Sequence, residues 1–237
     1  MSKIKLFCFP YAGGSAAIYM KWTKLLNNNI EVIPVELPGR GKRFVEPLSE
    51  NINEVVNDIF NFIVKHLDGT PYALFGYSMG SWIAFELIRK IKSHGHNSPI
   101  HAFFAAKEAP HIKRKSKNLH KLPTDEFSNE ILKLGGTPRE IFENEELRDI
   151  FITILKADYK IVETYNFTAH SSPLDCNITV FSGKEDEYKT EDIMGWQELT
   201  KKGCTIHTFD GGHFFIHDKL HDVVSIVNKT LIGQVSA

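Results

Sequence analysis

The stretch FGYSMGSW, residues Phe75–Trp82, places Ser78 between two glycines in the pattern G-x-S-x-G. It closes the apolar run YALFGY (72–77), which is typical of a buried strand, and leads into SWIAFELIRKI (81–91), whose apolar residues recur at helical spacing. A serine on a sharp strand-to-helix turn is held where its hydroxyl can act as a nucleophile. We therefore predict a nucleophilic role for Ser78; the alternative is a serine that only caps the helix.

The same alternation of strands and helices extends along the chain. Helical spacing recurs in 51–67 and in 190–202, where Thr190 is a candidate N-cap. This alternation predicts an α/β fold with a mostly parallel central sheet and helices on both faces. The other runs with strand character are 4–9, 30–37, 100–106, 178–183 and 204–209.

One region interrupts this rhythm. Residues 111–165 contain no strand-like run and have a mainly helical pattern. An insertion of this size in a parallel α/β fold usually lies at the carboxyl ends of the strands, where active sites form. We interpret it as a lid over a single domain that spans residues 1–237; the alternative is an ordinary peripheral helical layer.

Composition narrows the class of protein. With 237 residues the chain is long enough for one ordinary core, and its formal net charge of −1 favours no nucleic-acid partner. No run is long enough to span a membrane, and no signal peptide is evident. We expect a cytoplasmic protein, monomeric by expectation, with three unpaired cysteines that act as small apolar residues: Cys8, Cys176 and Cys204.

A serine nucleophile needs a base, and the base needs an orienting acid. His213 follows the last strand-like run and the turn DGG, a position from which it can reach across the top of the sheet. Asp186, in GKEDEY, follows the preceding strand and is our candidate acid. We expect His217 to be exposed and His207 to be structural. The other acids weighed are Glu185, Glu187, Asp210 and Asp158.

An oxyanion hole needs two N–H groups aimed at the developing charge. The backbone N–H of Met79, directly after the nucleophile, should provide one. The loop FPYAGGSA after the first strand should provide the other, from Ala12 or, as the fallback, from Gly13. The alternative for this loop is a plain glycine-rich turn.

A set of short motifs in fixed order covers nearly the whole chain, and together it closely resembles the type II thioesterases that accompany nonribosomal peptide and polyketide synthetases. The motifs are FPYAGGSA (9–16), VELPGRGKR (35–43), FGYSMGS (75–81), LPTDEF (122–127), LGGTP (134–138), LKADY (155–159), FSGKED (181–186) and FDGGHFF (209–215).

This resemblance implies an α/β-hydrolase fold with a helical lid. It also implies hydrolysis of acyl or aminoacyl thioesters on the phosphopantetheine arm of a partner carrier protein, with no cofactor or metal of the enzyme's own. The matching motifs give Ser78 as nucleophile, Asp186 as acid, His213 as base, and Met79 with Ala12 as oxyanion donors. Two positions depart from the family pattern. Tyr77 stands where histidine is common, and Ser81 stands where glycine or alanine is usual.

Several functional questions stay open at this level. The basic stretch HIKRKSKNLHK (111–121) is either a solvated loop or a docking surface for an acidic carrier, with Lys113, Arg114 and Lys115 as the candidates. Arg40 and Arg43 are further candidates for docking or for loop packing. The alternatives to an editing thioesterase are a serine esterase or lipase, a chain-terminating thioesterase or cyclase, and a non-catalytic carrier-binding module.

Overall fold

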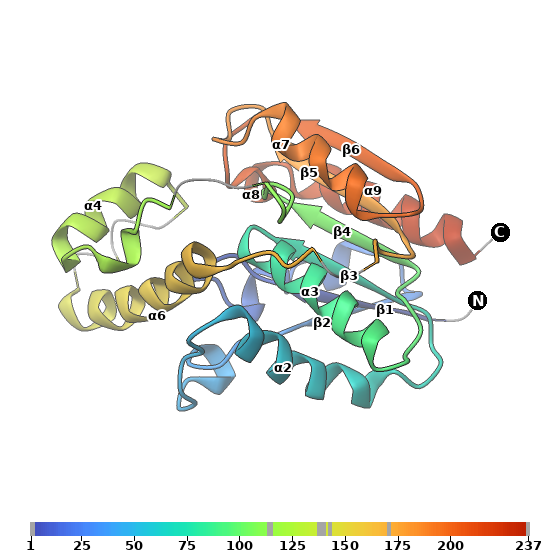
Figure 1. Ribbon diagram of the computed structural model, residues 1–237, viewed down its shortest axis with the longest axis horizontal. Helices are drawn as coiled ribbons and strands as arrows, with labels where there is room; N and C mark the ends of the chain where they lie inside the picture. Colours follow the sequence, from blue (N-terminus) through green and yellow to red (C-terminus); the bar gives the residue numbers. More distant parts are fainter. Residues whose placement is uncertain (1–2, 113–115, 137–140, 142–143, 170–171, 236–237) are drawn as a thin grey trace.

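The computed structural model describes residues 3–112, 116–136, 141, 144–169 and 172–235. Six strands form one parallel sheet in the order β2-β1-β3-β4-β5-β6 (Figure 1). Their bounds are β1 Ile4–Phe9, β2 Ile30–Pro34, β3 Tyr72–Tyr77, β4 His101–Ala105, β5 Asn177–Gly183 and β6 Cys204–Phe209. β2 lies on one side of β1, and β3 to β6 follow in chain order on the other side. This is the doubly wound arrangement expected of strand–helix alternation.

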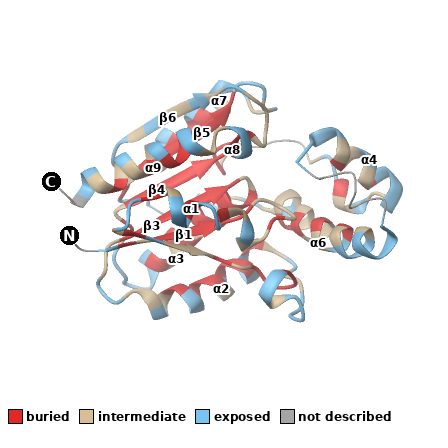
Figure 2. Cartoon of the chain, turned by 180° about the vertical axis from the view of Figure 1, so that it is seen from behind, coloured by how far each residue is buried: buried red, intermediate tan, exposed pale blue. Residues whose placement is uncertain are grey.

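Helices cover both faces of the sheet, as predicted. One face packs against α2, α3 and α7, and the other against α1, α8 and α9. All residues of β3 and β4 are buried, because the central strands of such a sheet are covered on both sides (Figure 2). The helices are α1 Trp22–Leu25, α2 Ile52–Ile63, α3 Met79–Ser93, α7 Thr190–Met194, α8 Phe215–Asp218 and α9 Leu220–Val235.

Three predicted boundaries need correction. β2 ends at Pro34 rather than at 37; the Val35 N–H still donates to the Cys8 carbonyl of β1 at 2.9 Å. The helical pattern over 51–67 ends as an α-helix at Ile63 and continues as a 3-10 turn, Val64–His66. Thr190 is the first residue of α7, not its cap; the backbone N–H of Lys189 just before it is satisfied by the Asp192 carboxylate at 3.1 Å.

The helical insertion lies between β4 and β5. It contains the 3-10 turn η4 (Leu119–Lys121), α4 (Thr124–Leu134) and α6 (Glu145–Thr164), and it projects beyond the carboxyl ends of the strands (Figure 1). Its helices share a small apolar core of their own, which makes it a satellite of the main core rather than a continuation of it. That core consists of Leu119, Phe127, Ile131, Ile152 and Leu155.

Other expectations from composition can be compared directly. Cys8 and Cys176 are buried, whereas Cys204 at the start of the edge strand is half-buried, and none of the three is in a disulfide. Over the described residues, no helix is both long and apolar enough to cross a membrane.

Candidate active site

The turn that carries Ser78 is strained and closely packed. Ser78 has φ 52° and ψ −116°, a conformation that non-glycine residues rarely adopt and that concentrates at functional sites. A Cβ added at Gly76 would lie 2.1 Å from the Gly80 carbonyl oxygen, and one at Gly80 would lie 2.3 Å from that of Phe9. The two glycines of the motif are therefore needed for β3, α3 and β1 to meet so closely.

Ser81, one of the two departures from the family pattern, stabilises this turn. Its hydroxyl oxygen accepts from the Ala105 N–H at 3.0 Å and lies 2.9 Å from both the Gly76 and the Ala105 carbonyl oxygens. The Ser78 N–H donates to the same Ala105 carbonyl at 2.7 Å. The buried hydroxyl thus ties the start of α3 to the ends of β3 and β4, which a glycine or alanine could not do.

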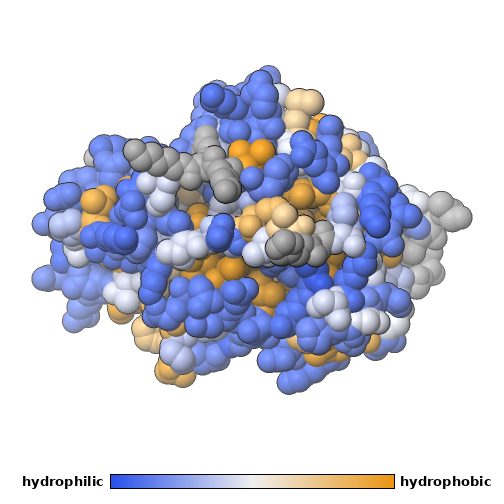
Figure 3. All heavy atoms as spheres, in the orientation of Figure 1, coloured by the Kyte–Doolittle hydropathy of each residue, from blue (hydrophilic) through white to orange (hydrophobic). Residues whose placement is uncertain are grey.

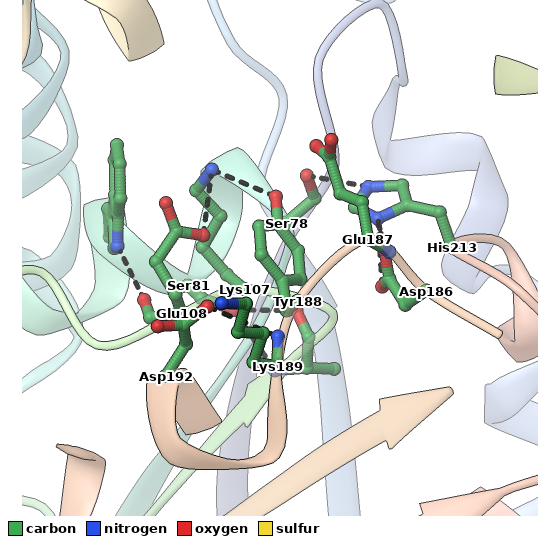
Figure 4. Close-up of polar contacts among 12 residues, drawn as sticks. Ser78, Ser81, Lys107, Glu108, Asp186, Glu187, Tyr188, Lys189, Asp192 and His213 are labelled. Atoms are coloured by element: carbon green, nitrogen blue, oxygen red, sulfur yellow. Dashed lines mark hydrogen bonds and ion pairs between the residues drawn. The ribbon is translucent and has the colours of Figure 1, made fainter. Parts of the chain in front are cut away.

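The structure brings the three predicted side chains together across the top of the sheet. His213 Nε2 lies 3.0 Å from Ser78 Oγ, and His213 Nδ1 lies 3.0 and 3.1 Å from the two Asp186 oxygens (Figure 4). The Asp186 side chain is 1% exposed and that of His213 is 22% exposed. This is the arrangement in which an imidazole takes a hydroxyl proton while a buried carboxylate orients the ring.

A third glycine lets the acid and base loops approach each other. Asp186 follows β5 in a turn, and its backbone N–H donates to the Gly183 carbonyl at 3.3 Å. A Cβ on Gly183 would lie 2.5 Å from the Gly211 carbonyl oxygen and 2.6 Å from that of Gly212, just before His213. The side chain of Asp186 reaches the base because these two loops pack backbone to backbone.

Of the other acids considered, Glu185 and Glu187 line the same cavity as Ser78, but the carboxylate in contact with His213 is that of Asp186. Asp210 is exposed and pairs with Lys184 at 2.6 Å. His207 is half-buried within β6. His217, on α8, is exposed as expected, and its ring nitrogen is 3.2 Å from the Tyr11 hydroxyl.

Tyr77, the second departure, anchors the backbone of the base. Its hydroxyl donates to the His213 carbonyl at 2.6 Å and accepts from the Ile216 N–H at 3.3 Å. Burial raises the pKa of Tyr77 well above its ordinary value, so the phenol remains a donor at any physiological pH. The sequence marked this residue only as unusual; nothing in it indicated a partner 136 residues away.

Tyr77→Phe should lower kcat/KM by roughly ten- to a hundredfold, because a small displacement of a catalytic group is costly. The loss of one buried hydrogen bond should reduce the free energy of unfolding by only about 1 kcal/mol. Tyr72→Phe is the matched control, since Tyr72 is also buried and donates at 2.6 Å to a carbonyl, that of Asn97, remote from the site. Equal activity losses in the two variants would contradict a positioning role for Tyr77.

The hydrogen bonds of the backbone N–H groups distinguish between Ala12 and Gly13, the two candidates for the second oxyanion donor. The Gly13 N–H donates to Asp158 Oδ2 at 2.7 Å and is therefore committed elsewhere. Among the described residues, the N–H groups of Ala12 and Met79 have no hydrogen-bond partner, and Met79 opens α3, where helix N–H groups are free. These contacts favour Ala12 over Gly13 as the second oxyanion donor.

Arg40 and Asp158 form a buried ion pair that holds the loop after β1, where Ala12 is the expected oxyanion donor. Two guanidinium nitrogens of Arg40 reach the Asp158 oxygens at 2.5 and 2.7 Å, and both residues are almost fully buried. Arg40 also donates to the Gly14 carbonyl at 3.3 Å. Since Asp158 lies on α6, the pair connects the helical insertion to the loop that carries Ala12.

The burial of Arg40 excludes it as a docking residue, because it cannot meet a partner protein. Arg43 joins its loop to α2 through bidentate contacts with Asp58 at 2.6 and 2.8 Å, and it also contacts Glu46 in the same loop. The remaining docking candidates, Lys113, Arg114 and Lys115, lie outside the described residues.

A cavity of about 1040 Å³ opens beside Ser78 and His213, between the insertion and the sheet. The surface view shows apolar residues gathered in the middle of this face of the molecule (Figure 3). Trp82 is only 7% exposed, yet it also forms part of the cavity wall. Within the described residues no cluster of three or more potential ligands could hold a metal ion.

A doubly wound parallel sheet with a strained serine turn, a buried carboxylate and a bridging imidazole defines a serine hydrolase of the α/β-hydrolase fold. Residues 4–231 match the family model described as a thioesterase domain. The chain therefore belongs to the thioesterase family.

Individual relatives match this chain over most of their own length. ClbQ from the colibactin NRPS/PKS pathway is 40% identical with a TM-score of 0.94, over 98% of both chains. The type II thioesterase BorB from the borrelidin biosynthetic cluster is 33% identical with a TM-score of 0.87, over 96% of this chain and 92% of BorB. Linear gramicidin dehydrogenase LgrE of Brevibacillus parabrevis is 36% identical over 97% of this chain and 88% of its own. The resemblance to type II thioesterases is confirmed.

Proposed function

We propose that the protein is an editing thioesterase. It hydrolyses acyl and aminoacyl thioesters from the phosphopantetheine arm of carrier-protein domains in nonribosomal peptide or polyketide biosynthesis. The observation that carries this proposal is the 3.0 Å contact between Ser78 Oγ and His213 Nε2 at the wall of a roomy cavity. The similarity to type II thioesterases supports the choice of a carrier-bound substrate.

The chemistry follows from the positions of the three side chains. His213 removes the Ser78 proton as the oxygen attacks the thioester carbonyl, and Asp186 stabilises the imidazolium that forms. The C–S bond then breaks, His213 returns the proton to the departing thiol, and the acyl group stays on Ser78. Water, deprotonated by His213, attacks the acyl-serine. The bond to Ser78 Oγ then breaks, His213 returns the proton to that oxygen, and the free acid is released.

Two further parts of the molecule have proposed roles in this reaction. The N–H groups of Met79 and Ala12 hold the oxyanion, a contribution typically worth about 3–4 kcal/mol per donor. The helical insertion forms the lid, whose α6 is joined to the oxyanion loop by Asp158. The reaction as proposed requires no metal or redox cofactor, because a hydroxyl, an imidazole and water provide every proton transfer.

The test loads one carrier protein with a panel of acyl and aminoacyl groups and measures their release by the wild-type protein. We expect free acid and free carrier thiol, with the carrier-bound groups cleaved much faster than the same groups as simple oxygen esters. Faster cleavage of the oxygen esters would indicate a small-molecule esterase or lipase instead. Formation of an aldehyde together with oxidation of a reduced nicotinamide cofactor would indicate a dehydrogenase. Binding of the loaded carrier without release of its acyl group would indicate a non-catalytic module.

A further inference from the structure

A charged pair forms part of the cavity wall beside the catalytic serine. Lys107 and Glu108 follow β4 directly, and they are only 6% and 3% exposed. Both contribute to the same cavity as Ser78. The same cavity is lined by apolar and aromatic residues, among them Trp82, Ile112 and Phe167, and by other polar ones such as Lys189 and Asp192.

The backbone is shaped to present this pair. Ala106, immediately before it, has φ 51°, the left-handed region that costs a non-glycine residue free energy. Two buried indoles then fix the next two carbonyls. Trp196 Nε1 donates to the Lys107 carbonyl at 2.9 Å, and Trp82 Nε1 donates to the Glu108 carbonyl at 3.0 Å.

The side chains of Lys107 and Glu108 differ in how far their hydrogen-bonding groups have partners. The Lys107 ammonium donates to the Tyr188 hydroxyl at 3.0 Å, lies 4.1 Å from the centre of the Trp82 ring and pairs with Glu108 Oε2 at 3.2 Å (Figure 4). Glu108 Oε2 is buried, and among the described residues it has the ammonium nearby but no hydrogen bond. The carboxylate is therefore an acceptor with spare capacity.

Stability does not explain this arrangement. A buried ion pair contributes little compared with apolar side chains of similar size, and a buried acceptor without a hydrogen bond is costly. The triad does not use the pair either, since the partners of His213 are Ser78 and Asp186. The pair lowers the stability of the fold and lines the cavity beside Ser78, so it is better explained by a role in binding what enters that cavity.

The pair is also close to the reacting centre along the sheet. Tyr77 is the register partner of Ala105, and the Ser78 N–H donates to the Ala105 carbonyl at 2.7 Å. Lys107 and Glu108 come two and three residues after Ala105, so they stand beside the serine turn at the same edge of the sheet. Ser78 and the pair thus line one cavity from the ends of neighbouring strands, and an acyl group bonded to Ser78 would extend into that cavity.

We propose that Glu108, held by Lys107, accepts a hydrogen bond from an N–H or O–H group on the acyl chain, near the thioester carbonyl. This inference rests on the proposed thioesterase function and names its preferred substrates, which are amino- or hydroxy-substituted acyl groups rather than plain alkyl chains. The lysine, 3.2 Å from Glu108 Oε2, holds the carboxylate in place, and the substrate donor completes its hydrogen bonding.

Such a site discriminates strongly because its buried polar group stays unpaired when the wrong substrate binds. Apolar pockets distinguish one methylene by only about 10- to 200-fold, whereas sites built to bind a polar group reject the analogue lacking it by far more. The pair therefore acts as a specificity determinant.

The test uses four thioesters with the same carbon chain on one carrier protein: butyryl, 3-hydroxybutyryl, 2-aminobutyryl and 3-aminobutyryl. Each kcat/KM is divided by the rate of uncatalysed hydrolysis of the same compound. We expect the wild-type protein to prefer at least one donor-bearing chain over butyryl by about tenfold or more. In K107M/E108Q, which removes both charges at similar volume, that preference should fall by about tenfold.

Each ratio is taken within one protein, so a partly unfolded variant lowers every rate but leaves the ratio meaningful. If the double variant does not fold, the ratios of donor-bearing to butyryl substrates measured for E108Q alone and for the wild-type protein still test the proposal. Butyryl cleaved as fast as every donor-bearing chain by the wild-type protein would overturn the inference, as would a preference unchanged in the variants. Hydrolysis of none of the four would overturn the proposed function itself. Ser78-dependent hydrolysis of all four without preference would overturn only the role of Glu108.

Discussion

Ser78→Ala is expected to lower kcat for thioester hydrolysis by roughly 10⁴- to 10⁶-fold, because it removes the nucleophile from a unit whose parts act together. The fold should survive, since alanine adds no atom to the strained turn. Thermal unfolding should therefore change little. The measurement is single-turnover release from an acyl-loaded carrier.

Two comparisons sharpen this prediction. Ser93→Ala, at the exposed far end of α3, should leave kcat unchanged. The double variant S78A/H213A should be no slower than Ser78→Ala alone, since His213 acts only through the missing hydroxyl. A Ser78→Ala protein that retains a tenth of the wild-type rate would contradict the assigned nucleophile.

Asp158→Asn should destabilise the protein by about 3–5 kcal/mol, because it leaves the Arg40 guanidinium buried without a countercharge. It should also lower kcat, because Asp158 holds the loop that carries Ala12 through the Gly13 N–H. Asp58→Asn is the matched control. Asp58 also binds an arginine, Arg43, in bidentate fashion, but its side chain is 32% exposed, so the cost should stay below about 1 kcal/mol.

A second variant separates stability from positioning. R40M/D158L replaces the ion pair with apolar side chains and should recover much of the lost stability, since buried pairs are often replaceable in this way. Its kcat should remain low, because the Gly13 N–H still lacks its acceptor. Recovery of both stability and kcat would show that the pair matters only for folding.

Local patterns in the sequence predicted the parts of the site that depend on short stretches of chain. G-x-S-x-G after an apolar run predicted the serine turn because the close approach at Gly76 and Gly80 tolerates no side chain. The late histidine and the acid after β5 followed from strand order, since parallel strands all end at one edge. Element ends were less certain. At Thr190 the cap fell one residue earlier, where an acid three positions on reaches a backbone N–H.

Contacts between distant segments could not be predicted in this way. Arg40 and Asp158 are 118 residues apart, and nothing in either segment encodes the other's position. From the sequence, Arg40 could serve either docking or loop packing, and its burial excludes docking. Likewise Lys107 and Glu108 resemble an ordinary charged pair in sequence, and only the packing of two indoles and the cavity beside them gives the pair a function to test.

The most direct test of the central claim is intact and peptide mass spectrometry of the protein, quenched with acid within milliseconds of mixing with an acyl-loaded carrier. The account predicts a transient mass increase equal to the acyl group, located on the peptide that contains Ser78 and absent from Ser78→Ala. Turnover with the acyl group on another residue, or with none on the protein at any time under conditions where deacylation is slow, would contradict it.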